Sequence, residues 1–462
     1  MLNRIEARNF KSFKHLDYKC AKLNLLTGLN GAGKSSFVQL MLMLRELAKT
    51  ICNPRVEIDL RDTGVARTFS DIKYCYSPKG EPMGFSVEFT GWKSMGKYGM
   101  ETSSKQKKAS RIITESGKSP HHVLVWQEDV LRAFRQHERD FEESMKLLKQ
   151  GDQQGFDDAR ELSDSKMESV RKRIMRAEKM RLAGDESVWW GVRFIEAFRA
   201  KPKEVHEGRW GSRYAMRLHG FNVADEERFD PEGGDIAEFL YKVGKEFALL
   251  DDNPMLHPQG ERKDHFLGGE ESTLLAQVNA WLGEISPGSK FLVDRVEVGD
   301  QDAYIVKIGF GEDCEGGKFK PQNVGLGISY ILPVLGTILT AWPTSIIIIE
   351  NPEAHIHPKG QAKLGELIAR AAAYGVQVLV ETHSDHVING VRVAVRDGIL
   401  KPEDVNIAFF ERKEHLKDDA KDSDDTEIYS EIRNIKVDVN GSLSEYPEDF
   451  MDEWNNQLLE LM

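Results

Sequence analysis

The chain has 462 residues, a formal net charge of −12 and a pI near 5.7. This length is too great for one simple hydrophobic core, so roughly two or three compact units are expected. The acidic balance excludes a protein that binds nucleic acid over its whole surface, but it leaves room for a local basic groove.

Targeting and redox signals are weak. The four cysteines are widely spaced, which favours reduced thiols over a disulfide frame or a zinc site. The N-terminus lacks the apolar core of a signal peptide, and the longest aliphatic run, 346–349, is far below the ~20 residues of a membrane helix. We therefore expect a cytoplasmic protein without a membrane partner.

The first 94 residues predict strands around a glycine-rich turn. Residues 23–27 form a short apolar segment typical of a buried strand, and 36–47 carries apolar residues at helical spacing. Between them, residues 28–35 read Gly-Leu-Asn-Gly-Ala-Gly-Lys-Ser, which matches every fixed position of G-x-x-x-x-G-K-[ST]. We call residues 28–35 the phosphate loop.

This pattern has a chemical reason. Its glycines let successive backbone N–H groups turn toward an anion at the start of a helix, where negative charge is favoured. Lys34 is expected to reach the β- and γ-phosphates, and the Ser35 hydroxyl to ligate Mg²⁺. The expected contacts to ATP come from Asn30, Gly31, Gly33, Lys34, Ser35 and Ser36. The alternative is a glycine-rich turn that matches the phosphate-loop pattern by chance and binds no ligand.

Residues 95–290 differ in composition. This range is rich in Lys, Arg, Asp and Glu, and the segments 127–150 and 158–183 lack proline and predict long helices. We expect a mainly helical insertion that acts as a lever or lid, such as a short coiled coil or antiparallel helix pair. A solvated arm that packs only on itself is an equal alternative.

In residues 291–412, strand and helix patterns alternate again. The segment 345–350 reads Ser-Ile-Ile-Ile-Ile-Glu, which predicts a strand buried on both faces of a parallel sheet. Glu350 then emerges at the carboxyl end, where α/β folds place ligands, and would hold Mg²⁺ through its water shell. Alone, this run indicates only a core strand; together with Lys34 it indicates a nucleotide site.

Two further segments suit the same site. Residues 376–381 predict the next strand, and His383 just after it can hydrogen-bond a γ-phosphate or position water, although a surface histidine is the alternative. Residues 323–329 open a helix over 330–339 with Gly325, Gly327 and Ser329, again an anion-binding geometry. On this segment alone, a capping turn without a ligand is favoured.

The last range, 413–462, predicts a short module. Residues 413–427 are polar and acidic and indicate an exposed loop. A strand is expected over 432–439, then a turn at Asn440-Gly441 and an amphipathic final helix.

These motifs together resemble the ATP-binding-cassette (ABC) ATPases, and more narrowly their SMC- and RecF-like branch. The opening Arg-Asn-Phe-Lys-Ser-Phe at 8–13 is similar to that branch's first strand, and residues 350–358 to its EPE-x-H-x-HP motif. The loop at 382–385 is similar to its switch-histidine loop, and 440–450 to the end of bacterial members labelled AAA. The implied fold is an α/β ABC-ATPase head with a mixed or parallel sheet and a phosphate loop, interrupted by the insertion. The resemblance implies Mg²⁺ and head-to-tail ATP binding in a homodimer or higher oligomer, with Gly325, Gly327 and Ser329 reading the neighbour's γ-phosphate.

The sequence departs from the family in three places: the residue after the Mg²⁺-holding acid, a degenerate signature around Ser329, and the lack of a clear glutamine in the loop that links core and insertion, where Asp71 or its neighbourhood is the substitute. Cassette ATPases place a catalytic glutamate directly after the Mg²⁺-holding acid, but this chain has Asn351, which cannot accept a proton. Either Glu353 supplies the base, or hydrolysis is slow and the ATP state persists. The expected catalytic set is Glu350, Asn351, Glu353 and His383.

Three functional hypotheses follow. The first is an ATP-driven machine that controls a separate, nuclease-like effector, in the antiphage setting that the resemblance implies. The second is a repair or chromosome-maintenance ATPase that binds DNA ends through basic segments such as 105–111 and 171–181. The third is an ATP-locked scaffold that barely hydrolyses.

Overall fold

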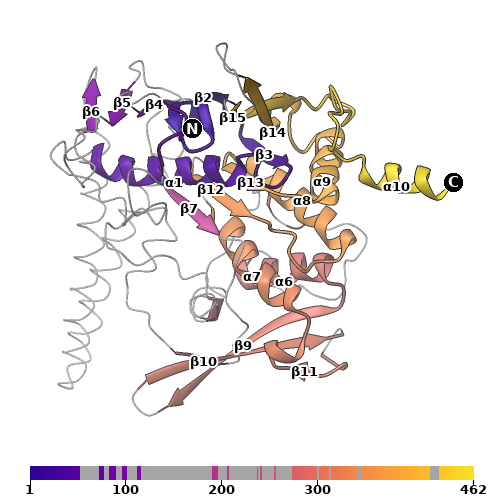
Figure 1. The fold of residues 1–462 in the computed structure, drawn as a ribbon. Coiled ribbons are helices and arrows are strands. Elements are labelled where there is room, and N and C mark those ends of the chain that lie inside the picture. The colour runs from indigo at the N-terminus through magenta and orange to yellow at the C-terminus, as the bar shows by residue number, and fades with distance from the viewer. Residues whose placement is uncertain are drawn as a thin grey trace, which may run out of the picture.

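The computed structural model is shown in Figure 1. The residues that it describes are 1–51, 72–77, 83–89, 96–100, 112–115, 190–195, 205–207, 237, 240–241, 254–255, 257, 273–298, 301–311, 314–341, 343, 345–416 and 426–462.

A six-stranded sheet forms the centre of the molecule. Its order is β15-β14-β3-β13-β12-β7, with every neighbouring pair parallel except β14 and β15. The strands are β3 (Leu23–Gly28), β7 (Trp190–Ile195), β12 (Ser345–Glu350), β13 (Gln377–Glu381), β14 (Val405–Leu416) and β15 (Thr426–Ile435). Because β3 lies between β13 and β14, the carboxyl ends of several parallel strands meet at one edge beside the phosphate loop.

Strand β12 shows why the sheet is buried on both faces. Ile347 and Ile349 belong to one hydrophobic core, while Ile346 and Ile348 belong to the other. Successive strand residues point to opposite faces, so a run of isoleucines fills both cores at once. The expected strand over 345–350 is therefore present with the predicted bounds.

Helices cover the two faces unequally (Figure 1). Helix α1 (Lys34–Ile51) packs on one face through residues such as Phe37 and Leu40. Among the described residues, four helices pack on the other face: α6 (Leu274–Ile285), α7 (Leu326–Leu339), α8 (Pro358–Ala373) and α9 (Asp385–Arg396). The short turns η2 (Pro321–Asn323) and η3 (Pro402–Asp404) precede α7 and β14.

Two antiparallel sheets complete the described architecture. The first has the order β2-β1-β4-β5-β6 and covers the outer side of α1, since β1 and β2 share its core. Its strands are β1 (Leu2–Phe10), β2 (Phe13–Lys19), β4 (Met83–Phe89), β5 (Gly96–Met100) and β6 (Ile112–Glu115). The second joins β8 (Val205–Glu207), β9 (Ser289–Val298), β10 (Gln301–Phe310) and β11 (Lys318–Phe319).

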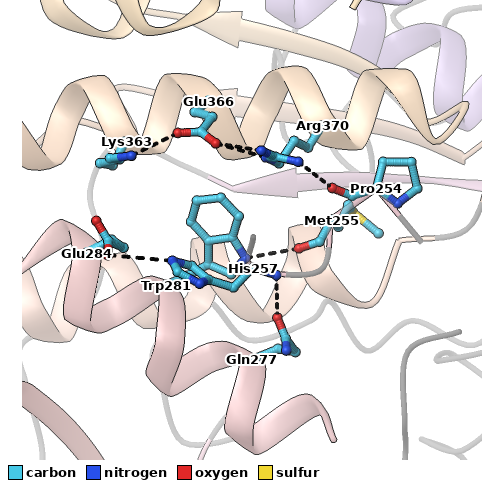
Figure 2. Close-up of polar contacts among 9 residues, drawn as sticks. All are labelled: Pro254, Met255, His257, Gln277, Trp281, Glu284, Lys363, Glu366 and Arg370. Atoms are coloured by element: carbon cyan, nitrogen blue, oxygen red, sulfur yellow. Dashed lines mark hydrogen bonds and ion pairs between the residues drawn. The ribbon is translucent and has the colours of Figure 1, made fainter. Parts of the chain in front are cut away.

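A polar network ties α6 to α8 (Figure 2). Glu366 on α8 accepts a hydrogen bond of 2.8 Å from Arg370, whose guanidinium also donates to the Pro254 carbonyl. The Trp281 indole donates to the Met255 carbonyl at 3.0 Å, and the His257 ring packs edge-on against the Trp281 ring. Pro254, Met255 and His257 are thereby held between the two helices.

The described parts of 95–290 differ from the expected insertion. This range supplies β5 and β6 to one antiparallel sheet, β7 to the edge of the central sheet and α6 to the core. The sequence pattern missed these elements because the strands are short and sit among highly charged segments. The long helices expected over 127–150 and 158–183 lie outside the described residues.

The C-terminal boundary is also placed differently. Strand β14 runs across the expected break at 412–413, and β15 starts at Thr426, so the predicted loop over 413–427 is shortened at both ends. Ten residue pairs join β14 to β15, which makes β15 the sixth strand of the central sheet. The final helix, α10 (Glu453–Leu461), projects away from the body (Figure 1). In the part of the chain that the structure describes, no helix is sufficiently long and apolar to span a bilayer.

Candidate nucleotide site

The phosphate loop joins β3 to α1 through glycines in the left-handed region. Gly28, Gly31 and Gly33 have φ values of 126°, 77° and 109°, which other residues adopt only with strain. A Cβ on Gly28 would collide with the Phe410 carbonyl of β14, and one on Gly33 would lie 2.8 Å from the Ser12 hydroxyl oxygen. Glycine is therefore required here both by conformation and by close packing.

Residues from opposite ends of the sequence support this loop. The Ser430 backbone N–H on β15 donates to the Ser12 carbonyl at 2.8 Å, and both side chains pack against Gly33. Asn30, Gly31 and Ser35 are exposed at the tip and at the start of α1, and Ser36 is partly exposed. These four of the expected phosphate contacts are thus accessible from solvent, whereas Gly33 and Lys34 are buried.

Lys34 is buried inside the loop. Only 4% of its surface is exposed, and its ammonium donates to the Gly28 and Leu29 carbonyls at 2.8 and 2.9 Å. Burial lowers the pKa of Lys34, and the Glu381 carboxylate opposes this shift. The ammonium is therefore held at the phosphate loop, beside a carboxylate that we did not predict.

Glu381 ends β13, the strand next to β3. It is 7% exposed and interacts with the Ser35 side chain by a hydrogen bond. Burial raises the pKa of Glu381, Lys34 opposes that rise and the nearby Glu353 carboxylate adds to it. The signal that could have revealed Glu381 was present: like Glu350, it is an acid at the last position of a buried strand.

The ends of β12 and β13 lie side by side. Glu350 and Glu381 are paired in the parallel register, and each follows by two residues a side chain of the α1-side core, Ile348 and Leu379. Because alternate residues share a face, both carboxylates lie on the α1 side, toward the phosphate loop. The expected position of Glu350 at a carboxyl strand end is confirmed as a point of geometry.

The loop after β12 brings Asn351 and Glu353 to the same edge. Asn351 has φ 42°, and its backbone N–H donates to the Glu381 carbonyl at 2.8 Å. A carboxylate oxygen of Glu353 accepts a hydrogen bond of 3.0 Å from the His383 backbone N–H. These contacts fix the loop after β12 to the loop after β13.

His383 is exposed at the tip of β13. Burial of part of its ring lowers the pKa of His383, and the Lys34 ammonium lowers it further. A neutral imidazole next to the phosphate loop can donate one hydrogen bond to a phosphate oxygen and accept another from water.

The start of α7 lies against the loop after β12. Helix α7 begins at Leu326, four residues earlier than expected, so Gly327 and Ser329 belong to its first turn and Gly325 is its N-cap. A Cβ on Gly327 would lie 2.9 Å from the His355 carbonyl carbon of this chain, whereas one on Gly325 would meet open space. The His355 carbonyl of the same chain occupies the space next to the Gly327 Cα, and the expected contact of Gly327 with a neighbour's phosphate stays a prediction.

The residues present fit a Mg²⁺–nucleotide. Within the described residues, one carboxylate oxygen of Glu381 is buried without a hydrogen-bond partner, beside a hydroxyl and an ammonium. Buried carboxylate oxygens and a serine hydroxyl are the donors that Mg²⁺ and its waters prefer. Ser35 and Glu350 are the residues expected to hold this ion.

Two parts of the chain match known family models. Residues 181–389 match the family model described as "AAA domain, putative AbiEii toxin, Type IV TA system", and residues 400–461 match one described as a protein of unknown function (DUF3696). No curated protein matches the sequence.

Solved SMC heads are also similar to the chain. The head from Pyrococcus furiosus with an extended coiled coil, bound to the C-terminal domain of ScpA, is 10% identical with TM-score 0.40, covering 93% of this chain and 96% of that one. The head from Thermotoga maritima is 8% identical with TM-score 0.38, covering 94% and 99%.

The matched AAA model begins at residue 181, inside the range expected as an insertion, and so includes β7, the edge strand of the central sheet. It ends at residue 389, beyond the His383 loop. The phosphate loop precedes the matched range. It begins at the end of β3, however, and β3 is paired with the matched strand β13. The central sheet, the phosphate loop and the matched AAA domain agree with the resemblance to an ATPase that the motifs indicate.

Proposed function

We propose that this chain binds and hydrolyses ATP, and that nucleotide-driven association of two copies controls a separate effector in antiphage defence. The observation that carries the proposal is the buried Lys34 ammonium beside Ser35, Glu381 and His383, at the edge where parallel strands end. A structural role alone does not require a buried lysine whose ammonium is held only by loop carbonyls and a nearby carboxylate.

Each residue has a role in this proposal. Lys34 exchanges the Gly28 and Leu29 carbonyls for phosphate oxygens, which are stronger acceptors. Ser35 would hold Mg²⁺ directly and Glu350 through its water shell, and the ion would neutralise charge on the phosphates. His383 donates a hydrogen bond to the γ-phosphate or positions the attacking water.

The proton of the attacking water goes to Glu353. Asn351 can orient water but cannot accept its proton, whereas Glu353 is anchored by the His383 backbone N–H. With a base displaced from the usual position, we expect hydrolysis that is slow but not absent. An ATP-locked scaffold is the second candidate, favoured by Asn351 at that position.

Association uses the exposed start of α7. Gly325 is exposed, and Leu326 beside it exposes 43% of its surface. Leu29, in the phosphate loop, exposes 57%. Apposing the phosphate loop of one copy to the start of α7 of another buries these apolar side chains and brings backbone N–H groups of a helix N-terminus to the γ-phosphate.

The effector and the defence setting rest on the resemblance and on the matched family. That family's description names a toxin of a toxin–antitoxin system, which supports control of a harmful activity. The basic segments that would serve DNA binding, 105–111 and 171–181, lie outside the described residues. DNA binding is therefore an outcome to be tested.

The test uses the full chain and its K34A variant. We expect a fluorescent ATP analogue with Mg²⁺ to bind wild type, ATP to increase the sedimentation coefficient, and phosphate release to be measurable. K34A should bind the analogue about 10–100-fold more weakly and lose the other two responses. Purification from the native host followed by mass spectrometry should recover a stoichiometric partner. Binding of the analogue that K34A leaves unchanged would refute the nucleotide site, and salt-sensitive DNA binding without a protein partner would favour a repair role.

A further inference from the structure

We propose that Glu381 is a second carboxylate for the Mg²⁺ of the nucleotide site, acting with Glu350 and Ser35. This inference rests on the proposed function, because it requires nucleotide to bind at the phosphate loop. It assigns to the end of β13 a role that the sequence motifs place only at the end of β12.

Strand order makes Glu381 the nearer acid. Strand β13 is hydrogen-bonded directly to β3, and Glu381 is paired with Leu26, two residues before the phosphate loop begins. Strand β12, which carries Glu350, is one strand further away, at the ~4.8 Å spacing of a sheet. A cation held by Ser35 therefore lies nearer to the carboxylate at the end of β13 than to the carboxylate at the end of β12.

The contacts of Glu381 also support a role in Mg²⁺ binding. Its carboxylate interacts with the hydroxyl of Ser35, the residue expected to ligate Mg²⁺, and it lies within electrostatic reach of Lys34. Although Glu381 is 93% buried, one of its oxygens has no hydrogen-bond partner among the described residues. A buried carboxylate oxygen without a partner is costly, and a cation or its bound water removes that cost.

The negative charge of Glu381 distinguishes a role in Mg²⁺ binding from a purely structural role, because the two predict different effects on nucleotide affinity. As a simple partner of Lys34, Glu381 would still face the phosphates once nucleotide binds, because the loop and strand are fixed by packing. Two carboxylates next to a triphosphate repel it unless a cation lies between them. Nucleotide affinity should therefore depend strongly on Mg²⁺, and removing the Glu381 charge should weaken this dependence.

The experiment compares wild type with E381Q, using a fluorescent ATP analogue in EDTA and at increasing free Mg²⁺. In EDTA, we expect E381Q to bind the analogue more tightly than wild type, by about 5-fold or more. The free Mg²⁺ concentration at half-maximal enhancement should rise by about 10–100-fold, as should the Mn²⁺ dissociation constant measured by electron paramagnetic resonance with nucleotide present.

The matched control is E403Q, which removes one negative charge from η3. Glu403 is exposed and precedes β14, so it lies at the amino edge of the sheet, opposite the site. We expect E403Q to behave like wild type, and E381D to keep the Mg²⁺ dependence in part. Thermal unfolding of each variant checks that the fold is retained.

The outcomes separate the two proposals. If E381Q binds the analogue less tightly in EDTA as well as in Mg²⁺, Glu381 only positions Lys34 and Ser35, and the inference is wrong. An unchanged Mg²⁺ midpoint in E381Q overturns it too. If wild type binds no analogue in a manner sensitive to K34A, the proposed function itself has failed.

Discussion

Gly327 and His355 are packed so closely that no side chain larger than a hydrogen fits between them. A Cβ on Gly327 would lie 2.9 Å from the His355 carbonyl carbon and nearer still to its oxygen. The His355 ring also packs edge-on against Tyr330, one turn along α7, at 5.3 Å between ring centres. The first turn of α7 is thereby attached to the loop that carries Asn351 and Glu353.

This contact predicts a stability effect. Gly327→Ala should lower the free energy of unfolding by about 1–3 kcal/mol, because the loop after β12 must move to admit the methyl group. Gly325→Ala is the control: its added Cβ meets open space, and the change should stay within about 0.5 kcal/mol. Denaturant unfolding of both variants measures the difference. Equal effects would show that the contact is loose in solution.

A second prediction concerns association of heads. Gly325→Val places an exposed branched side chain at the start of α7 without an internal clash, so it should block ATP-driven association. Nucleotide affinity of the separate head should be unchanged, since the phosphate loop is untouched. Sedimentation with and without ATP and Mg²⁺, beside direct nucleotide titration, tests both points. Association of the variant at wild-type strength would refute the shared-site arrangement.

The substitution Lys34→Ala should weaken ATP binding while leaving the thermal stability of the protein nearly unchanged. The ammonium makes charge-assisted hydrogen bonds, so its loss should weaken ATP binding by about 10–100-fold. The midpoint of thermal unfolding should stay within about 4 °C, because Lys34 contributes only two hydrogen bonds to loop carbonyls. Calorimetric titration and a thermal melt give the two quantities. A large loss of stability would mean that the buried ammonium is chiefly structural.

Glu353→Gln should lower ATP turnover by about 10²–10⁴, the usual effect of removing a positioned base. ATP binding should be retained, because the variant keeps the acceptor oxygen that anchors the His383 loop. Asn351→Gly is the control: glycine accepts the φ of 42° at that position, so only the water-orienting amide is lost. Single-turnover phosphate release distinguishes them. Turnover of Glu353→Gln at the wild-type rate would exclude Glu353 as the base.

The polar network of Figure 2 predicts a pH effect on stability. Burial lowers the pKa of His257 below its ordinary value of 6.5, although carboxylates raise it in part. The charged groups that face its ring are Glu284, Glu366, Lys363 and Arg370. The folded chain thus binds this proton less readily than the unfolded chain, so stability falls as pH drops through 6.5 toward the lower folded value.

The measurement compares His257→Gln with wild type at pH 7.5 and 5.5. We expect the variant to lose less of its free energy of unfolding over this interval, because its other titrating groups are unchanged. His15→Gln, which replaces an exposed histidine on β2, should follow wild type. If His257→Gln follows wild type as well, His257 does not contribute to the pH dependence.

The sequence was most informative where one physical requirement dominates. The phosphate loop needs glycines at fixed positions, and the isoleucines of β12 can be satisfied only in a strand covered on both faces, so both elements are where the pattern places them. Glu381 was not singled out because a lone acid at a strand end is common; its meaning depends on Ser35 and Lys34, which only the strand order brings near.

The sequence pattern also did not predict the contacts between segments that are distant along the chain. Nothing local indicates that Gly327 packs on His355 or that Ser430 packs on Gly33. Strand β7 joins the central sheet from a range dominated by charged residues, and the long-range pairing with β12 is what defines it. Such elements follow from tertiary pairing, which residue spacing does not encode.

The wide separation of paired strands in the sequence means that one strand is synthesised long before its partner. Asn24 on β3 and Val378 on β13 are 354 residues apart, yet they share a hydrogen bond. At roughly 5–20 residues per second, β3 emerges from the ribosome roughly 20–70 s before β13. For that interval its edges lack their native neighbours and are open to pairing with other chains. A nascent chain therefore cannot assemble the proposed nucleotide site until β13 has been translated, so nucleotide can stabilise only chains that have passed that point.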